Sequence, residues 1–141
     1  MKLLTDHRGA APILFLGIVF ALLCLVLLIA ELGGTYEQYD YAMDVMQRAC
    51  NSAVERNIRD NYRADKILLL DCESAKRDFQ SFLSEDMPGR YQVQVASVTC
   101  TASPPSMTVL GQVSFSTFFS QFGFDVVSFN FKVRATNYDL D

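Results

Sequence analysis

Residues 9–30 read GAAPILFLGIVFALLCLVLLIA, a run of 22 residues without a charge. As an α-helix this run would be roughly 33 Å long, which matches the ~30 Å hydrocarbon core of a bilayer. Apolar side chains lie on all sides of such a helix, and this is not the pattern of a helix that rests on a membrane surface. The run therefore predicts a transmembrane helix over residues 10–31.

The charges on either side of the run predict its orientation. Lys2, Arg8 and the terminal amino group precede it, and the first charged residues after it are acidic: Glu31, Glu37, Asp40 and Asp44. Basic flanks remain in the cytoplasm, so we expect a single-pass protein of the cytoplasmic membrane. The predicted segments are a cytoplasmic N-terminus over residues 1–9, the transmembrane helix over 10–31 and an extracytoplasmic domain over 32–141.

The part of the chain from Glu31 onward is acidic and small. Its roughly 110 residues are enough for one domain. It contains ten Lys and Arg and fifteen Asp and Glu, a net charge of −5. An acidic surface repels nucleic acid, so we expect no nucleic-acid partner.

A long amphipathic helix is expected directly after the membrane segment. Gly33 and Gly34 weaken a helix and predict a hinge. Residues 36–62 then follow a helical period, and one face of that helix carries Tyr39, Met43, Met46, Cys50 and Ala53. This face either lies on a sheet or contacts neighbouring subunits of a filament.

The remaining sequence predicts a second helix and three strands. Asp71 or Glu73 caps a helix through Glu85, whose buried side would hold Phe79, Phe82 and Leu83; residues 67–70 are strand or first helical turn. From residue 91 the apolar period becomes two, with a bulge near Ser97 and further strands over 107–116 and 127–136. We therefore expect an α+β fold, in which the amphipathic helix covers one face of a C-terminal antiparallel three-stranded meander.

The cysteines allow several pairings. Cys24 lies in the apolar run, whereas Cys50, Cys72 and Cys100 lie in the predicted extracytoplasmic domain, where disulfides persist. Two of these three could form a disulfide: Cys50 with Cys100 across the core, or Cys72 with either. All three could also remain reduced. No CxxC spacing accompanies them, so we expect no metal site.

Residues with catalytic chemistry are scarce. The one histidine, His7, is on the cytoplasmic side of the predicted span, and helix capping accounts for the acids near positions 71–73 and 85–86. Neither a nucleophile with a base nor a phosphate-binding loop can be assembled, so we expect no enzyme, no cofactor and no small-molecule substrate. One cluster stands out as either a folded-over loop or an interaction patch: Phe118, Phe119, Phe122 and Phe124.

Several short motifs resemble one family. Arg8-Gly9 opens the apolar run, Glu31-Leu32-Gly33 and Tyr36 close it, and a small-residue segment follows over residues 49–53. These motifs, together with the final strand over 127–136, resemble the TadE/TadG-like minor pilins of tight-adherence (Flp) pilus systems. The resemblance implies a bacterial, pilin-like subunit that is anchored in the cytoplasmic membrane and assembles or primes a Tad-type pilus or a related secretion apparatus. Its partners would be other pilin-like subunits or membrane proteins of that apparatus.

The resemblance also implies a processing site between Gly9 and Ala10. Family members carry Glu at the fifth position after the cleaved Gly, where this chain has Leu14. We therefore expect the anchor to stay uncleaved.

Two other functions fit the same sequence. One is a bitopic envelope accessory or sensor protein that is unrelated to pili. The other is a secreted protein released by signal-peptide cleavage after Leu28-Ile29-Ala30, although a bulky Leu stands there where a small residue is preferred.

Overall fold

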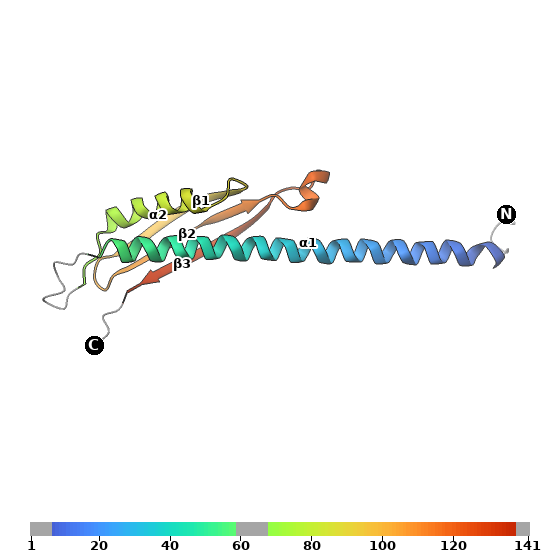
Figure 1. Cartoon of the computed structure of the whole chain (residues 1–141), viewed down its shortest axis with the longest axis horizontal. Coiled ribbons are helices and arrows are strands. Elements are labelled where there is room, and N and C mark those ends of the chain that lie inside the picture. Colours follow the sequence, from blue (N-terminus) through green and yellow to red (C-terminus); the bar gives the residue numbers. More distant parts are fainter. Residues whose placement is uncertain (1–6, 59–67, 138–141) are drawn as a thin grey trace. The chain divides into compact units, whose positions relative to one another are not determined.

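The computed structural model describes residues 7–58 and 68–137 and divides the chain into two compact units, residues 1–36 and 37–141 (Figure 1). The boundary lies five residues beyond the predicted end of the membrane segment at residue 31. Most of the predicted cytoplasmic segment, as well as Tyr62 and Ile67, lies outside the described residues.

Helix α1 is His7–Arg56, a helix of 50 residues. Its residues 11–30 are exposed throughout. Gly33 and Gly34 are helical, and a Cβ atom added at either would meet nothing within 4 Å. The backbone is thus helical where a hinge was expected, and bending at these glycines stays a prediction.

The end of α1 differs from the expected end near Tyr62. The helix stops at Arg56, and Asn57 provides the physical reason. Its side-chain amide donates to the carbonyl of Ala53 at 2.8 Å, which satisfies a carbonyl that the helix end leaves without a partner. Ile58 then forms an isolated antiparallel bridge with Leu70, so the chain is already extended there.

The sheet contains three antiparallel strands in the order β1-β2-β3: β1 (Tyr91–Thr101), β2 (Ser106–Phe115) and β3 (Val127–Thr136). The predicted meander is therefore confirmed. The register between β1 and β2 shifts between Val95 and Ser97, at the predicted bulge. This shift returns Val98 and Cys100 to the same face as Tyr91, Val93 and Val95, because it adds one residue to a period of two.

A glycine in the middle of β2 makes room for an aromatic ring. Gly111 is paired with Phe131 of β3, and a Cβ atom on Gly111 would lie 2.7 Å from the tip of that ring. The backbone carbonyl of Gln94 on β1 would also collide with it. Only glycine at this position allows Phe131 to lie across the sheet and stay buried.

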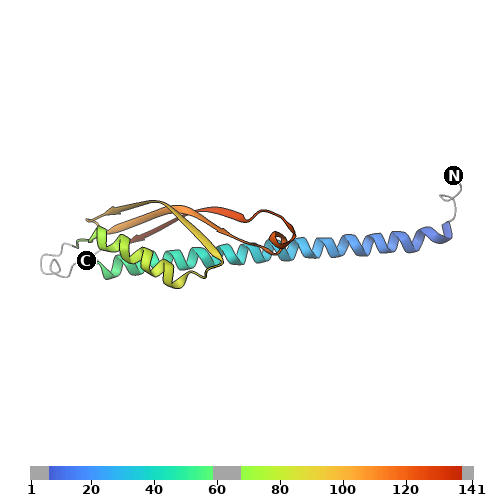
Figure 2. The same ribbon diagram turned by 90° about the horizontal axis from the view of Figure 1, so that it is seen from above.

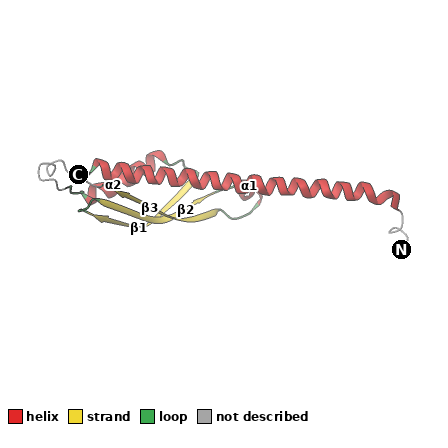
Figure 3. Ribbon diagram, turned by 90° about the horizontal axis from the view of Figure 1, so that it is seen from below, coloured by secondary structure: helices red, strands yellow, loops and turns green. Residues whose placement is uncertain are grey.

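Both helices cover the same face of the sheet (Figures 2 and 3). The sequence predicted that the amphipathic helix covers the sheet, and this was incomplete, since α2 (Cys72–Asp86) also contributes Ala75, Phe79 and Leu83 to the core. The described core of the second unit thus has three sources: α1, α2 and the inner face of the sheet. The buried residues of α1 are Ala42, Val45, Met46, Ala49, Cys50, Ala53 and Val54.

Local polar contacts fix the two helices to each other and to the sheet. Asp71 is the N-cap of α2 and accepts from the backbone N–H of Ser74 at 3.3 Å, as predicted for one of two candidate caps. Asp78 of α2 accepts from the Asn57 amide at 2.9 Å and lies 3.6 Å from the Arg56 guanidinium. On the other side of α1, Gln47 donates to the carbonyl of Arg134 on β3 at 2.9 Å.

Candidate interaction surface

The second unit has two distinct ends, and the contacts of α1 identify them. Near its start within this unit, Tyr39 lies 5.0 Å from the ring of Phe129, and Tyr41 stacks on Tyr91 at 5.9 Å. Phe129 is near the start of β3 and Tyr91 is the first residue of β1. We call this end, at which Glu37 enters the unit, the entry end.

The opposite end, which we call the far end, joins the other connections. The backbone N–H of Asp71 donates to Asn57 at 3.1 Å, and that of Leu70 donates to Ala102 at 3.1 Å. The turn between β1 and β2 also lies here. The β2–β3 connection must therefore lie at the entry end, because β2 runs away from the far end and β3 runs back towards it.

That connection, residues 117–126, is the aromatic loop, and it carries all four phenylalanines that the sequence singled out. Phe118, Phe122 and Phe124 are 51%, 66% and 66% exposed. Phe119 is half-buried. Val126 of the same loop is 58% exposed, although the sequence did not single it out. Strand parity was the available signal, since Val126 precedes Val127 and therefore faces away from the inner side of the sheet.

The loop is a defined turn whose ends are fixed by hydrogen bonds. Its 3₁₀ helix η2 (Phe118–Phe122) starts at Thr117, whose backbone N–H donates to the Ser120 hydroxyl at 3.1 Å. It ends at Gly123, which adopts a left-handed conformation (φ 88°) that favours glycine. Within the turn, ring centroids lie 5.3–5.9 Å apart in three pairs: Phe118–Phe119, Phe118–Phe122 and Phe119–Phe124.

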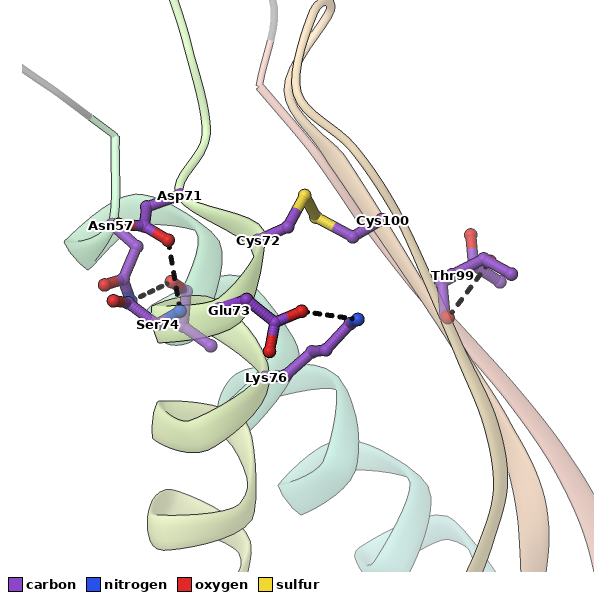
Figure 4. The surroundings of a disulfide bond; sticks show 10 residues. Asn57, Asp71, Cys72, Glu73, Ser74, Lys76, Thr99 and Cys100 are labelled. Atoms are coloured by element: carbon purple, nitrogen blue, oxygen red, sulfur yellow. Dashed lines mark hydrogen bonds and ion pairs between the residues drawn. A yellow bond between two sulfur atoms is a disulfide. The ribbon is translucent and has the colours of Figure 1, made fainter.

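A disulfide joins Cys72 and Cys100, with Cα atoms 5.8 Å apart (Figure 4). Cys72 is the first residue of α2, and Cys100 is the penultimate residue of β1. The bond thus connects the second helix to an edge strand at the far end. Of the pairings left open by the sequence, the one across the core between Cys50 and Cys100 is not formed.

Cys50 is a free thiol and is completely buried. It faces the junction of β2 and β3, where its S–H donates a hydrogen bond to the Met107 carbonyl, with the sulfur 3.8 Å from the oxygen. Burial raises the pKa of this thiol from 9.0 to about 11, and a hydrogen bond with the Ala135 backbone offsets part of the rise. The thiol therefore stays protonated at neutral pH.

This burial predicts slow chemical modification and a loss of stability at alkaline pH. Two pKa units reduce the thiolate fraction near neutral pH by about a hundredfold, so iodoacetamide should leave Cys50 unmodified in the folded protein and modify it in urea. The stabilising contribution of the neutral thiol is fully present below pH 9.0 and is lost as the pH rises through about 11. Unfolding measured across this range should show a steeper decline for the parent chain than for Cys50→Ala. Both chains should carry Cys24→Ser, because Cys24 is an exposed free cysteine.

The remaining sites considered in the sequence are the processing site, a metal site and the acid at the start of α2. Gly9 and Ala10 are helical residues of α1, and processing there stays a prediction. Within residues 7–58 and 68–137, no three His, Cys, Asp or Glu side chains are grouped so that they could hold a metal ion. Glu73 pairs with Lys76 at 3.1 Å in the first turn of α2.

The chain matches no protein-family model, no curated protein and no solved structure.

Proposed function

We propose that the chain is a single-pass membrane protein whose second unit is held outside the cytoplasm and binds other proteins. The observation that supports this most is the exposure of residues 11–30, an uncharged segment with no covering side chains from the described residues. Among the residues that the structure describes, one helix is long and apolar enough to cross a membrane. A signal sequence would meet the same criterion. A Cys72–Cys100 disulfide is typical of a compartment outside the cytoplasm.

Within this class, we propose a minor pilin-like subunit that assembles or primes a Tad-type pilus or a related apparatus. The motifs over residues 8–55 support this, as does the order of an apolar helix, an amphipathic continuation and an antiparallel meander. The subunit would bind partner helices in the bilayer through close side-chain packing. A bitopic accessory or sensor protein remains the alternative.

Membrane extraction tests the anchor. The full chain should remain in the membrane during carbonate washing, while Leu22→Arg/Leu23→Arg should be released or degraded. Each arginine at the centre of a span costs about 2.5–3.5 kcal/mol on insertion scales. Gln80→Arg/Ser81→Arg is the matched control, because it adds the same charges at exposed positions of α2. An intact mass that lacks the first 30 residues would instead establish a cleaved signal peptide.

Crosslinking in native membranes tests the assembly role. We expect adducts with pilin-like subunits or with membrane proteins of a pilus apparatus, identified by mass spectrometry. Recovery of monomer alone from cells that make the apparatus would contradict the role. A secretion ATPase and a prepilin peptidase encoded nearby would favour a pilus over a sensor.

A further inference from the structure

We propose that the aromatic loop inserts into the interfacial layer of the bilayer that holds the apolar segment, which gives the second unit an additional, non-covalent attachment to lipid. This inference rests on the proposed function, because it requires residues 11–30 to lie in a membrane. It concerns a different part of the chain, since the loop connects β2 and β3 of the second unit. In this proposal the exposed side chains of the aromatic loop contact the headgroups and the upper acyl region of the outer leaflet.

The chemistry of the loop suits this layer. Phe118, Phe122, Phe124 and Val126 are each more than half exposed, and the rings of Phe118 and Phe122 are 5.3 Å apart. The one charged residue of the loop is Asp125. Elements that lie in the interface bury apolar side chains roughly 5–10 Å deep, and their binding grows with the apolar area that they bury.

The loop presents these side chains in a fixed arrangement. Its backbone is closed by hydrogen bonds from Gly123 to Ser120 and from Phe124 to Phe119, at 3.3 and 3.4 Å. The half-buried Phe119 contacts both Phe118 and Phe124, and these contacts limit the movement of the two exposed rings. Insertion therefore needs little ordering of the loop, and less of the favourable free energy is lost as entropy.

Chain connectivity keeps the loop within reach of lipid. Six residues, 31–36, separate the apolar run from Glu37, and even a fully extended chain of this length spans only about 20 Å. The aromatic loop lies at the entry end, as the contact between Tyr39 and Phe129 requires. A short tether gives the loop a high effective concentration at the membrane surface.

The composition of the loop favours lipid over a protein partner. Residues that dominate protein interfaces are Trp, Tyr and Arg, which combine a large contact area with a polar group that fixes the orientation. Residues 117–126 contain none of these. Phenylalanine and valine supply apolar area without directional bonds, which is what a fluid layer of acyl chains can accept.

Tryptophan fluorescence tests the proposal in the full chain, because the sequence contains no tryptophan. Phe122→Trp places a single probe in the loop, and Ala102→Trp is the matched control in the exposed turn at the far end. Each protein is reconstituted in phosphatidylcholine vesicles with and without lipids brominated near the top of the acyl chains. We expect blue-shifted emission and several-fold stronger bromine quenching for the Phe122→Trp chain than for the control. Adding Phe118→Ser and Phe124→Ser should reduce that quenching several-fold.

The outcomes separate this proposal from the anchor. A chain that carbonate removes from the vesicles contradicts the proposed function itself. A chain that stays anchored, but whose loop tryptophan is quenched by aqueous iodide and not by bromolipid, overturns the lipid contact alone. Shielding that appears only when partner subunits are added would show that the surface binds protein, which also overturns it. Bromine quenching that persists in high salt and without anionic lipid supports insertion driven by apolar area.

Discussion

Replacing Phe79 by alanine is expected to lower the free energy of unfolding of the second unit by about 3–5 kcal/mol. Phe79 is completely buried and lies on the face of α2 that also holds Ala75 and Leu83, which precede and follow it by four residues, about one turn each. Removing its ring leaves a cavity beneath α2. Small domains are stable by only about 5–15 kcal/mol, so this loss would remove a large share of the total stability. Urea unfolding of the full chain in detergent, followed by the near-ultraviolet circular dichroism of its tyrosines, measures the effect.

Phe122→Ala is the matched control for that substitution. It removes the same ring at a position that is 66% exposed, where a change of about 0.5 kcal/mol or less is expected. Phe79→Leu should fall between the two, because it keeps most of the apolar volume. Equal destabilisation by Phe79→Ala and Phe122→Ala would show that the aromatic loop is part of the folding core, against both the exposure of Phe122 and the proposed lipid contact.

The sheet and the helical face were predictable because each depends on a local period. Alternation placed Val127, Phe129 and Phe131 on one face of β3, and they lie on the inner side of the sheet. A change of parity after Val95 predicted the bulge. Met46, Cys50 and Ala53 recur at helical spacing and are buried. Such patterns specify which side of an element is apolar, and only one side of each element can face the core.

Features that depend on how elements meet were not predictable. The sequence predicted a buried side for α2, but it did not predict that this side packs on the same face of the sheet as α1 (Figures 2 and 3). The disulfide pairing depends on the start of α2 and the end of β1 meeting at the far end. Cys50 instead lies more than one helical turn before the end of α1. No spacing rule distinguishes these three cysteines. The end of α1 at Arg56 depends on Asn57 and its contact with Asp78, a residue of another helix.

The sequence predicted which phenylalanines belong to the candidate surface, but not which of them are exposed. Four phenylalanines within seven residues are visible in the sequence, but alternation stops after Phe115, so no period says which of them face the solvent. The turn that exposes three of them depends on Thr117, Ser120 and the left-handed Gly123. The geometry of a 3₁₀ turn is set by these polar residues, which an analysis of apolar periodicity does not consider.

Loss of the Cys72–Cys100 disulfide should lower the free energy of unfolding by about 2–4 kcal/mol. The bond closes a loop with a sequence separation of 28 residues that contains all of α2 and most of β1. It removes conformations from the unfolded chain, and a loop of this length corresponds to roughly 3.5 kcal/mol in the entropy model. Within the described part of the chain, β1 is an edge strand that pairs with β2 alone, so reduction should first loosen α2 and β1 at the far end. Cys72→Ser/Cys100→Ser, unfolded in urea under the same conditions as the parent chain, measures the loss.

Reductant supplies the control, because it should destabilise the parent chain and Cys50→Ala equally and leave Cys72→Ser/Cys100→Ser unchanged. The non-reduced parent chain should also be lighter by two hydrogen atoms than its reduced form. A parent chain that is insensitive to reductant would mean that helix packing alone holds α2 on the sheet. The expected sensitivity links the fold to the proposed location, since a domain that draws this share of its stability from a disulfide is fully stable only where thiols are oxidised. Protein retained in the cytoplasm should accordingly be degraded faster than exported protein, and Cys72→Ser/Cys100→Ser should remove most of that difference.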